Sequence, residues 1–145
     1  ACEKGEQWMQ AMHVFGQVQQ RSIEPSVITY NAAISACGKG VRWLQALQLL
    51  ADLYQHKLEP TVITYNAAIS ACGRSKEWEH SLHLLRELRQ RTVEPTVITY
   101  SAAISACEKE EQWVKAVHVL REFQQSNLEA DIIPYNAAIS ACEKG

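Results

Sequence analysis

The segment VITYNAAISAC, which begins at Val27, decides the fold because it returns along the chain at a fixed interval of 35 residues. Self-similarity at such a period is the signature of a protein built from stacked structural repeats. The further copies read VITYNAAISAC, VITYSAAISAC and IIPYNAAISAC, and they start at Val62, Val97 and Ile132. With Val27 as the first place, the chain holds three complete units at 27–61, 62–96 and 97–131, between partial units at 1–26 and 132–145.

Each unit is expected to form two helices joined by a turn. In 27–39, the intervals of three and four that mark one helical face separate Tyr30, Ala33, Ile34 and Cys37. A second helix is predicted over 43–55 from the apolar set Trp43, Ala46, Leu47, Leu50 and Leu53. Gly40 and its neighbours would form the turn, and Pro60 would end the unit because proline disfavours helical geometry in the residue before it.

A single pair of helices cannot bury both of its apolar faces, so neighbouring units must stack. The chain is therefore predicted to be all-α, a solenoid of helix-turn-helix repeats forming one array over 1–145. Neither terminal partial unit holds a polar capping helix, and we expect the array to continue beyond both ends of this sequence. No apolar run approaches the roughly 20 residues that a membrane helix needs, so no membrane-spanning segment is expected.

The unit resembles the pentatricopeptide repeat (PPR) family, in its P-type form of 35 residues. The resemblance covers the whole chain and rests on the V-I-T-Y-N opening, the Ala46-Leu47 pair and the closing Glu59-Pro60-Thr61. The uniform wording YNAAISACEKG is similar to arrays in some algal proteins of this family. The tetratricopeptide repeat, which generally binds peptides, runs on 34 residues instead. The resemblance implies a right-handed superhelical solenoid that binds single-stranded RNA in a chloroplast or mitochondrion.

A polar stripe is expected along the first helix of each unit. Ile28, Asn31, Ser35 and Lys39 lie three, four and four residues apart, which places them on one helical face. Every stripe ends in a cation, and these cations are Lys4, Lys39, Arg74, Lys109 and Lys144. A row of positive charges can follow a phosphate backbone. The alternative is that each cation is a solvated side chain, favoured near a helix C-terminus by the helix dipole.

The family resemblance assigns roles to further places in each unit. It implies that the fifth and last residues select a base, which gives the pairs Asn31 with Thr61, Asn66 with Thr96, and Ser101 with Asp131, while Asn136 has no visible partner. The second residue of each unit would pack on base faces, and these residues are Ile28, Ile63, Ile98 and Ile133. Family usage suggests the reading pyrimidine, pyrimidine, guanine, pyrimidine from RNA 5′ to 3′. The alternative for Asn31 is an exposed helix-start residue without a target.

Several residue types that could carry chemistry are better explained as structural. The five cysteines lie one per unit, about 8–10 Å apart by helix packing distance, which is too far for a disulfide, so buried thiols are expected. The histidines are expected on the convex surface and the four tryptophans in the core. We expect no metal, no cofactor and no catalytic activity, because no Gly-rich phosphate loop or nucleophile–base pattern occurs.

The overall charge leaves a second hypothesis open. A net charge of -2 and a pI near 6.2 give no support to nucleic-acid binding, and Glu3, Glu108 and Glu143 lie directly beside cations of the row. The leading hypothesis is a sequence-selective RNA-binding module in organellar RNA processing, stability or translation. The alternative is a non-catalytic scaffold that binds protein subunits of a large organellar complex.

Overall fold

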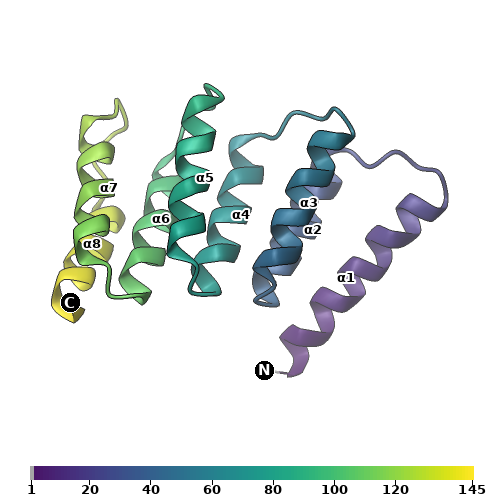
Figure 1. Ribbon diagram of the computed structural model, residues 1–145, viewed down its shortest axis with the longest axis horizontal. Coiled ribbons are helices and arrows are strands. Elements are labelled where there is room, and N and C mark those ends of the chain that lie inside the picture. Colours follow the sequence, from purple (N-terminus) through teal and green to yellow (C-terminus); the bar gives the residue numbers. More distant parts are fainter. Residues whose placement is uncertain (1) are drawn as a thin grey trace.

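The computed structural model describes the backbone of residues 2–145 and the side chains from Glu6 onward. Figure 1 shows the described helices side by side in chain order, in two layers. Their bounds are α1 Cys2–Gln20, α2 Val27–Lys39, α3 Trp43–Gln55, α4 Val62–Arg74, α5 Trp78–Gln90, α6 Val97–Lys109, α7 Trp113–Gln125 and α8 Ile132–Lys144. The two helices predicted for the unit 27–61 are therefore confirmed, residue for residue.

The helices α2, α4, α6 and α8 form one continuous layer, and each packs against the next. The helices α3, α5 and α7 pack on their own partners in the first layer, and between themselves they meet through long side chains such as Trp43 and His80. Closer spacing in one layer than in the other curves the array towards the first layer. The predicted fold class, a right-handed superhelical solenoid of helix-turn-helix repeats, is confirmed.

Close packing within the first layer depends on small residues. A Cβ atom added at Gly38 would lie 3.3 Å from Ala71 Cβ, and one added at Gly73 would lie 3.1 Å from Ala106 Cβ. Tyr30 and Ile34 of α2 are fully buried, as the intervals of three and four predicted. Burial of such side chains contributes about 1.5–3 kcal/mol each to the free energy of folding.

The helix starts are capped by hydroxyl groups. In the unit 62–96, the Thr61 backbone N–H donates to Thr64 Oγ1 at 3.0 Å, and Thr61 and Thr64 form a capping box at the start of α4. Ser26 with Thr29 and Thr96 with Thr99 repeat this arrangement. These caps satisfy backbone donors that a helix N-terminus otherwise leaves without partners.

Gly40 and its neighbours form the turn between the two helices, as expected. Gly40 has an ordinary φ of -83°, whereas the following residue Val41 takes the left-handed conformation with φ 57°. Lys76 and Glu111 occupy the same place with φ 62° and 56°. A Cβ atom added at Gly40 would lie 2.4 Å from the Trp8 ring, whereas the equivalent turns carry Ser75 and Glu110.

Hydroxyl groups of the buried tyrosines join the two layers. Tyr30 in α2 donates to Asp52 Oδ2 in α3 at 2.6 Å. Tyr65 in α4 donates to Glu87 in α5 at 3.1 Å and also contacts Tyr54 of the preceding unit. Burial and the neighbouring carboxylates raise the pKa of Tyr30 and Tyr65 well above the usual range, so both remain protonated donors.

The predictions for cysteine and tryptophan fail at the end of the array. Cys37, Cys72 and Cys107 are buried as expected, but Cys142 is exposed, because no further unit packs over α8. The side chain of Cys2 lies outside the described residues. Trp43 and Trp78 are half-buried and pack against the core as expected, Trp8 is half-buried, and Trp113 is 46% exposed.

The histidines follow the expectation with one exception. Those at 13, 83 and 118 lie on outer helices and are exposed, and His56 is exposed just after α3. His80 is half-buried, because its ring packs 4.6 Å from the ring of Trp43.

Candidate nucleic-acid interface

The predicted stripe lies on the accessible side of the first-layer helices. At its beginning, Ile28 is 80% exposed, and the equivalent isoleucines are 63%, 66% and 58% exposed at 63, 98 and 133. Exposed apolar side chains that gather on one face can mark a ligand-binding surface. At its end, Lys39, Arg74 and Lys109 are exposed, and within the described residues none of them has an ion-pair partner.

A groove runs along α6 between α4 and α8. It has a volume of about 330 Å³, with Ile98 and Ile133 at one end, Ser101 and Ser105 along its length, and Arg74 and Lys109 at the other end. The apolar, hydroxyl and cationic parts of the stripe therefore share one open surface. Such a surface offers a place for a base, space beside it and charge for a phosphate.

The cations of successive units also lie close to one another. Lys39, Arg74 and Lys109 line a single hollow of about 590 Å³, together with Gln7 and Val41. Three unpaired cations around one hollow create a positive potential that the net charge of -2 does not reveal.

The two terminal cations differ from these three. Lys144 Nζ donates to Glu108 Oε1 at 2.7 Å, and Ser140 Oγ donates to the same oxygen at 2.6 Å. The charge of Lys144 is therefore balanced by Glu108, although its position in the repeat matches that of Lys39, Arg74 and Lys109. The side chain of Lys4 lies outside the described residues, and its backbone belongs to the outer helix α1.

The fifth and last residues of the first two units are joined by a third residue. Thr64 Oγ1 donates to Asn31 Oδ1 at 2.5 Å, and Thr61 Oγ1 lies 3.4 Å from the same hydroxyl. The next unit repeats this set, with Thr99 Oγ1 donating to Asn66 Oδ1 at 2.6 Å. Thr64 and Thr99 are fully buried, and sequence reasoning gave them no role in the site.

The third unit lacks this connection. Pro134 occupies the place of Thr64 and has no hydroxyl, and the buried Oγ of Ser101 has no hydrogen-bond partner among the described residues. The side chain of Asp131 accepts from the Ile133 backbone N–H at 2.9 Å and so caps α8. Asn136 is exposed. Ser101 thus faces the groove along α6 with an unsatisfied hydroxyl.

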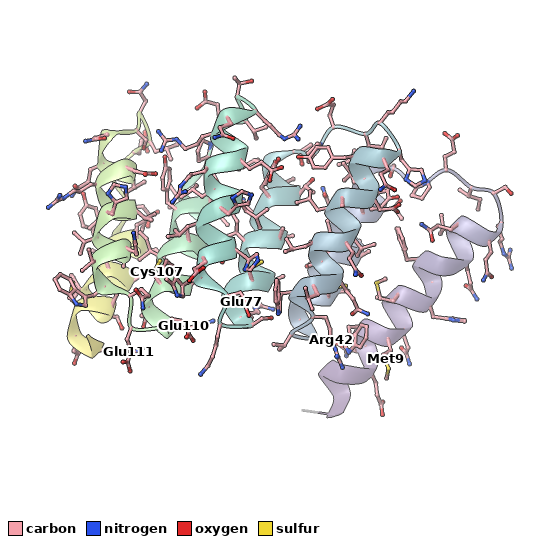
Figure 2. All side chains as sticks on the ribbon, viewed as in Figure 1. Met9, Arg42, Glu77, Cys107, Glu110 and Glu111 are labelled. Atoms are coloured by element: carbon pink, nitrogen blue, oxygen red, sulfur yellow. The ribbon has the colours of Figure 1, made fainter. Side chains whose placement is uncertain are left out.

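Acidic residues gather at the edge where the turns lie. Figure 2 places Glu77, Glu110 and Glu111 along this edge, in line with Arg42 of the first turn. Opposite charges beside the cation row reduce its field and lower its attraction for phosphate.

Two of the buried thiols are unsuited to chemistry, and the described residues form no metal site. Burial raises the pKa of Cys72 to about 12 and that of Cys107 to about 11, so both thiols stay protonated and unreactive at neutral pH. Among the residues that the structure describes, no group of three potential metal ligands comes together. No described helix is long and apolar enough to cross a membrane.

Family models match nearly the whole repeat array. The model described as the PPR repeat family matches residues 25–74 and 60–109, the pentatricopeptide repeat domain matches 2–40, and the PPR repeat matches 98–128. This chain belongs to the pentatricopeptide repeat family. No curated protein sequence matches this PPR chain.

Solved structures of PPR proteins share its fold. PPR10 in complex with an 18-nt psaJ RNA element is 25% identical with a TM-score of 0.84, over 94% of this chain and 20% of that chain. The PPR domain of Arabidopsis thaliana protein-only RNase P 1, in complex with tRNA, is 13% identical with a TM-score of 0.82, over 97% and 74% of the two chains. This PPR chain therefore spans about one fifth of the length of PPR10.

Proposed function

We propose that this PPR segment binds single-stranded RNA along its first-layer helices and distinguishes bases unit by unit. The observation that carries the proposal is the groove along α6, where Ile98, Ser101 and Lys109 offer an apolar contact, a hydroxyl and a cation in one line. The structure of PPR10 in complex with an RNA element supports the same ligand class. The segment has no catalytic role in this proposal.

Each part of the stripe has its own task. The exposed isoleucines at 28, 63, 98 and 133 contact base faces. The fifth and last residues of each unit select the base, which gives pyrimidine, pyrimidine, guanine and pyrimidine along the RNA. Lys39, Arg74 and Lys109 contact phosphates, whereas Lys144 does so only after leaving Glu108. An organellar location, with a role in RNA processing, stability or translation, belongs to this proposal through the family resemblance.

Salt dependence of binding tests the phosphate contacts. Replacing Lys39, Arg74 and Lys109 by alanine should weaken binding to a short RNA carrying UUGU. It should also reduce the slope of log K against log salt by about 2, since each single-strand contact contributes roughly 0.7. The control replaces the exposed cations Lys57, Arg86 and Lys115, which removes the same charge from other surfaces. Equal slopes for both triple variants would refute the phosphate role.

A scaffold function is the second candidate, because outer surfaces expose Leu44 and Val114 at 59% and 58%. Copurification separates the two functions. RNA that is lost on nuclease treatment supports the first, whereas a fixed protein partner that survives nuclease, with no RNA present, supports the scaffold.

A further inference from the structure

Two asparagines on the proposed RNA face are held by residues of the following unit. Thr64 Oγ1 reaches Asn31 Oδ1 at 2.5 Å, and Thr99 Oγ1 reaches Asn66 Oδ1 at 2.6 Å. The two members of each contact are 33 residues apart, and both threonines are fully buried. A buried threonine whose hydroxyl both accepts and donates a hydrogen bond has one orientation.

The direction of these hydrogen bonds decides which end of the amide faces outward. The Thr64 hydroxyl accepts the Thr61 backbone N–H at 3.0 Å, and it gives its single proton to Asn31 Oδ1. This hydrogen bond uses one of the two lone pairs of the amide oxygen and turns that oxygen towards Thr64. The Nδ2 group, with its two N–H donors, is the end of Asn31 left for a ligand.

We propose that Thr64 and Thr99 are positioning residues for base selection, each acting on the unit before its own. They fix Asn31 and Asn66 as donor groups, so these units select bases that offer a carbonyl acceptor, as the pyrimidine O2 does. A freely rotating asparagine can instead pair with adenine through one donor and one acceptor. The inference rests on the RNA-binding function proposed above, and it assigns the choice of base partly to the neighbouring unit.

The third unit provides an internal contrast. There the fifth place is Ser101 instead of asparagine, and the position that would hold its amide is Pro134 instead of threonine. Both members of the contact are thus replaced together. An asparagine at 101 would receive no hydrogen bond from position 134, because proline has no hydroxyl. The smaller Ser101 leaves the groove along α6 open.

The test compares Thr64→Val with two matched variants. Valine has nearly the shape of threonine but no hydroxyl, and Thr64→Ser keeps the hydroxyl. Thr29→Val removes the same capping group from α2, but the sequence holds no fifth-place residue before it. The cost of losing the cap is therefore measured separately. Thr99→Val repeats the test one unit further along.

The first measurement needs no RNA. In nuclear magnetic resonance spectra, the side-chain amide and carbonyl signals of Asn31 should shift in Thr64→Val and stay in place in Thr64→Ser and Thr29→Val. Unchanged Asn31 signals in folded Thr64→Val would overturn the inference whatever the protein binds.

The second measurement uses UUGU RNA with either of the first two bases replaced by adenine. Thr64→Val should reduce discrimination against adenine about three- to tenfold at the first base only, the value of one net hydrogen bond. Thr99→Val should do so at the second base only. Retained binding with unchanged discrimination overturns the inference alone. Failure of the unmodified chain to bind any RNA overturns the proposed function instead.

Discussion

Lys144 in α8 and Glu108 in α6 form an ion pair of 2.7 Å that links two units of the array. Glu108 occupies the place that Gly38 and Gly73 hold in the first two units. Where those glycines let helices approach closely, Glu108 uses the space for a carboxylate that accepts from Lys144 and Ser140. One change of residue type thus adds a charge pair between α6 and α8 and takes one cation out of the proposed phosphate row.

Glu108→Gln should make stability less dependent on acidic pH. The hydrogen bonds from Lys144 and Ser140 hold the pKa of Glu108 below its usual range. A carboxyl group whose pKa is lower in the folded chain than in the unfolded chain stabilises the fold. The stabilisation is complete at pH values above the pKa of the unfolded chain, and it is lost as the pH falls through the pKa of the folded chain. Melting temperatures measured from pH 7 to pH 3 should fall less in Glu108→Gln than in the unmodified chain. Glu143→Gln, which removes the same charge from an exposed site, should fall as the unmodified chain does.

Ser101→Asn should abolish any preference for guanine at the third base. Because Pro134 has no hydroxyl, the new amide stays free to rotate, and this unit should show weaker pyrimidine selection than its neighbours. The double variant Ser101→Asn with Pro134→Thr should restore that selection. Binding of UUGU and of the three RNAs with another third base measures both effects, and a persistent guanine preference in Ser101→Asn would contradict the assigned role of Ser101.

Tyr30→Phe should lower the free energy of unfolding by about 1 kcal/mol, the net value of one hydrogen bond. It removes the donor to Asp52 while keeping the buried ring. Tyr100→Phe is the matched control, because within the described residues the Tyr100 hydroxyl makes no hydrogen bond and its ring packs on Phe123. Urea denaturation followed by circular dichroism gives both values. Equal losses would show that the Tyr30–Asp52 bond adds nothing to stability.

Gly16→Ala should raise the free energy of unfolding by about 0.5–1 kcal/mol, because alanine favours a helix interior over glycine. Nothing lies within 4 Å of a Cβ atom at this position. Gly73→Ala should lose that gain, since its Cβ atom would lie 3.1 Å from Ala106 Cβ and force α4 and α6 apart. Melting temperatures of both variants check the contrast, and a similar increase in each would contradict the close packing described for the first layer.

The helices could be predicted from the sequence because their determinants are local. The intervals between Tyr30, Ile34 and Cys37 define a buried face by themselves, and Pro60 and Pro95 mark the ends of the first two complete units. The exposure of Ile28 followed from the same helical geometry. The left-handed residue at Val41 did not, since its conformation depends on how two helices pack rather than on a glycine.

The site was harder to predict, because its decisive contacts join residues of different units. Asn31 and Lys39 could be placed on one surface from their spacing, but the hydrogen bond to Thr64 depends on how closely two units approach. The pairing of Lys144 with Glu108 is equally non-local. A signal was nevertheless present, since Ser101 and Pro134 replace asparagine and threonine in the same step of the repeat.

The hydrogen bond between Asn31 and Thr64 also determines how many residues must be transplanted to move one base-selecting unit into another array. A graft cut at the repeat boundary, 27–61, carries Asn31 and Thr61 but leaves behind the hydroxyl that orients the amide. A graft of 27–64 carries the full set. A transplanted unit therefore has to end inside the first turn of the following helix. The choice of base by one unit then depends on the residue that the next unit supplies.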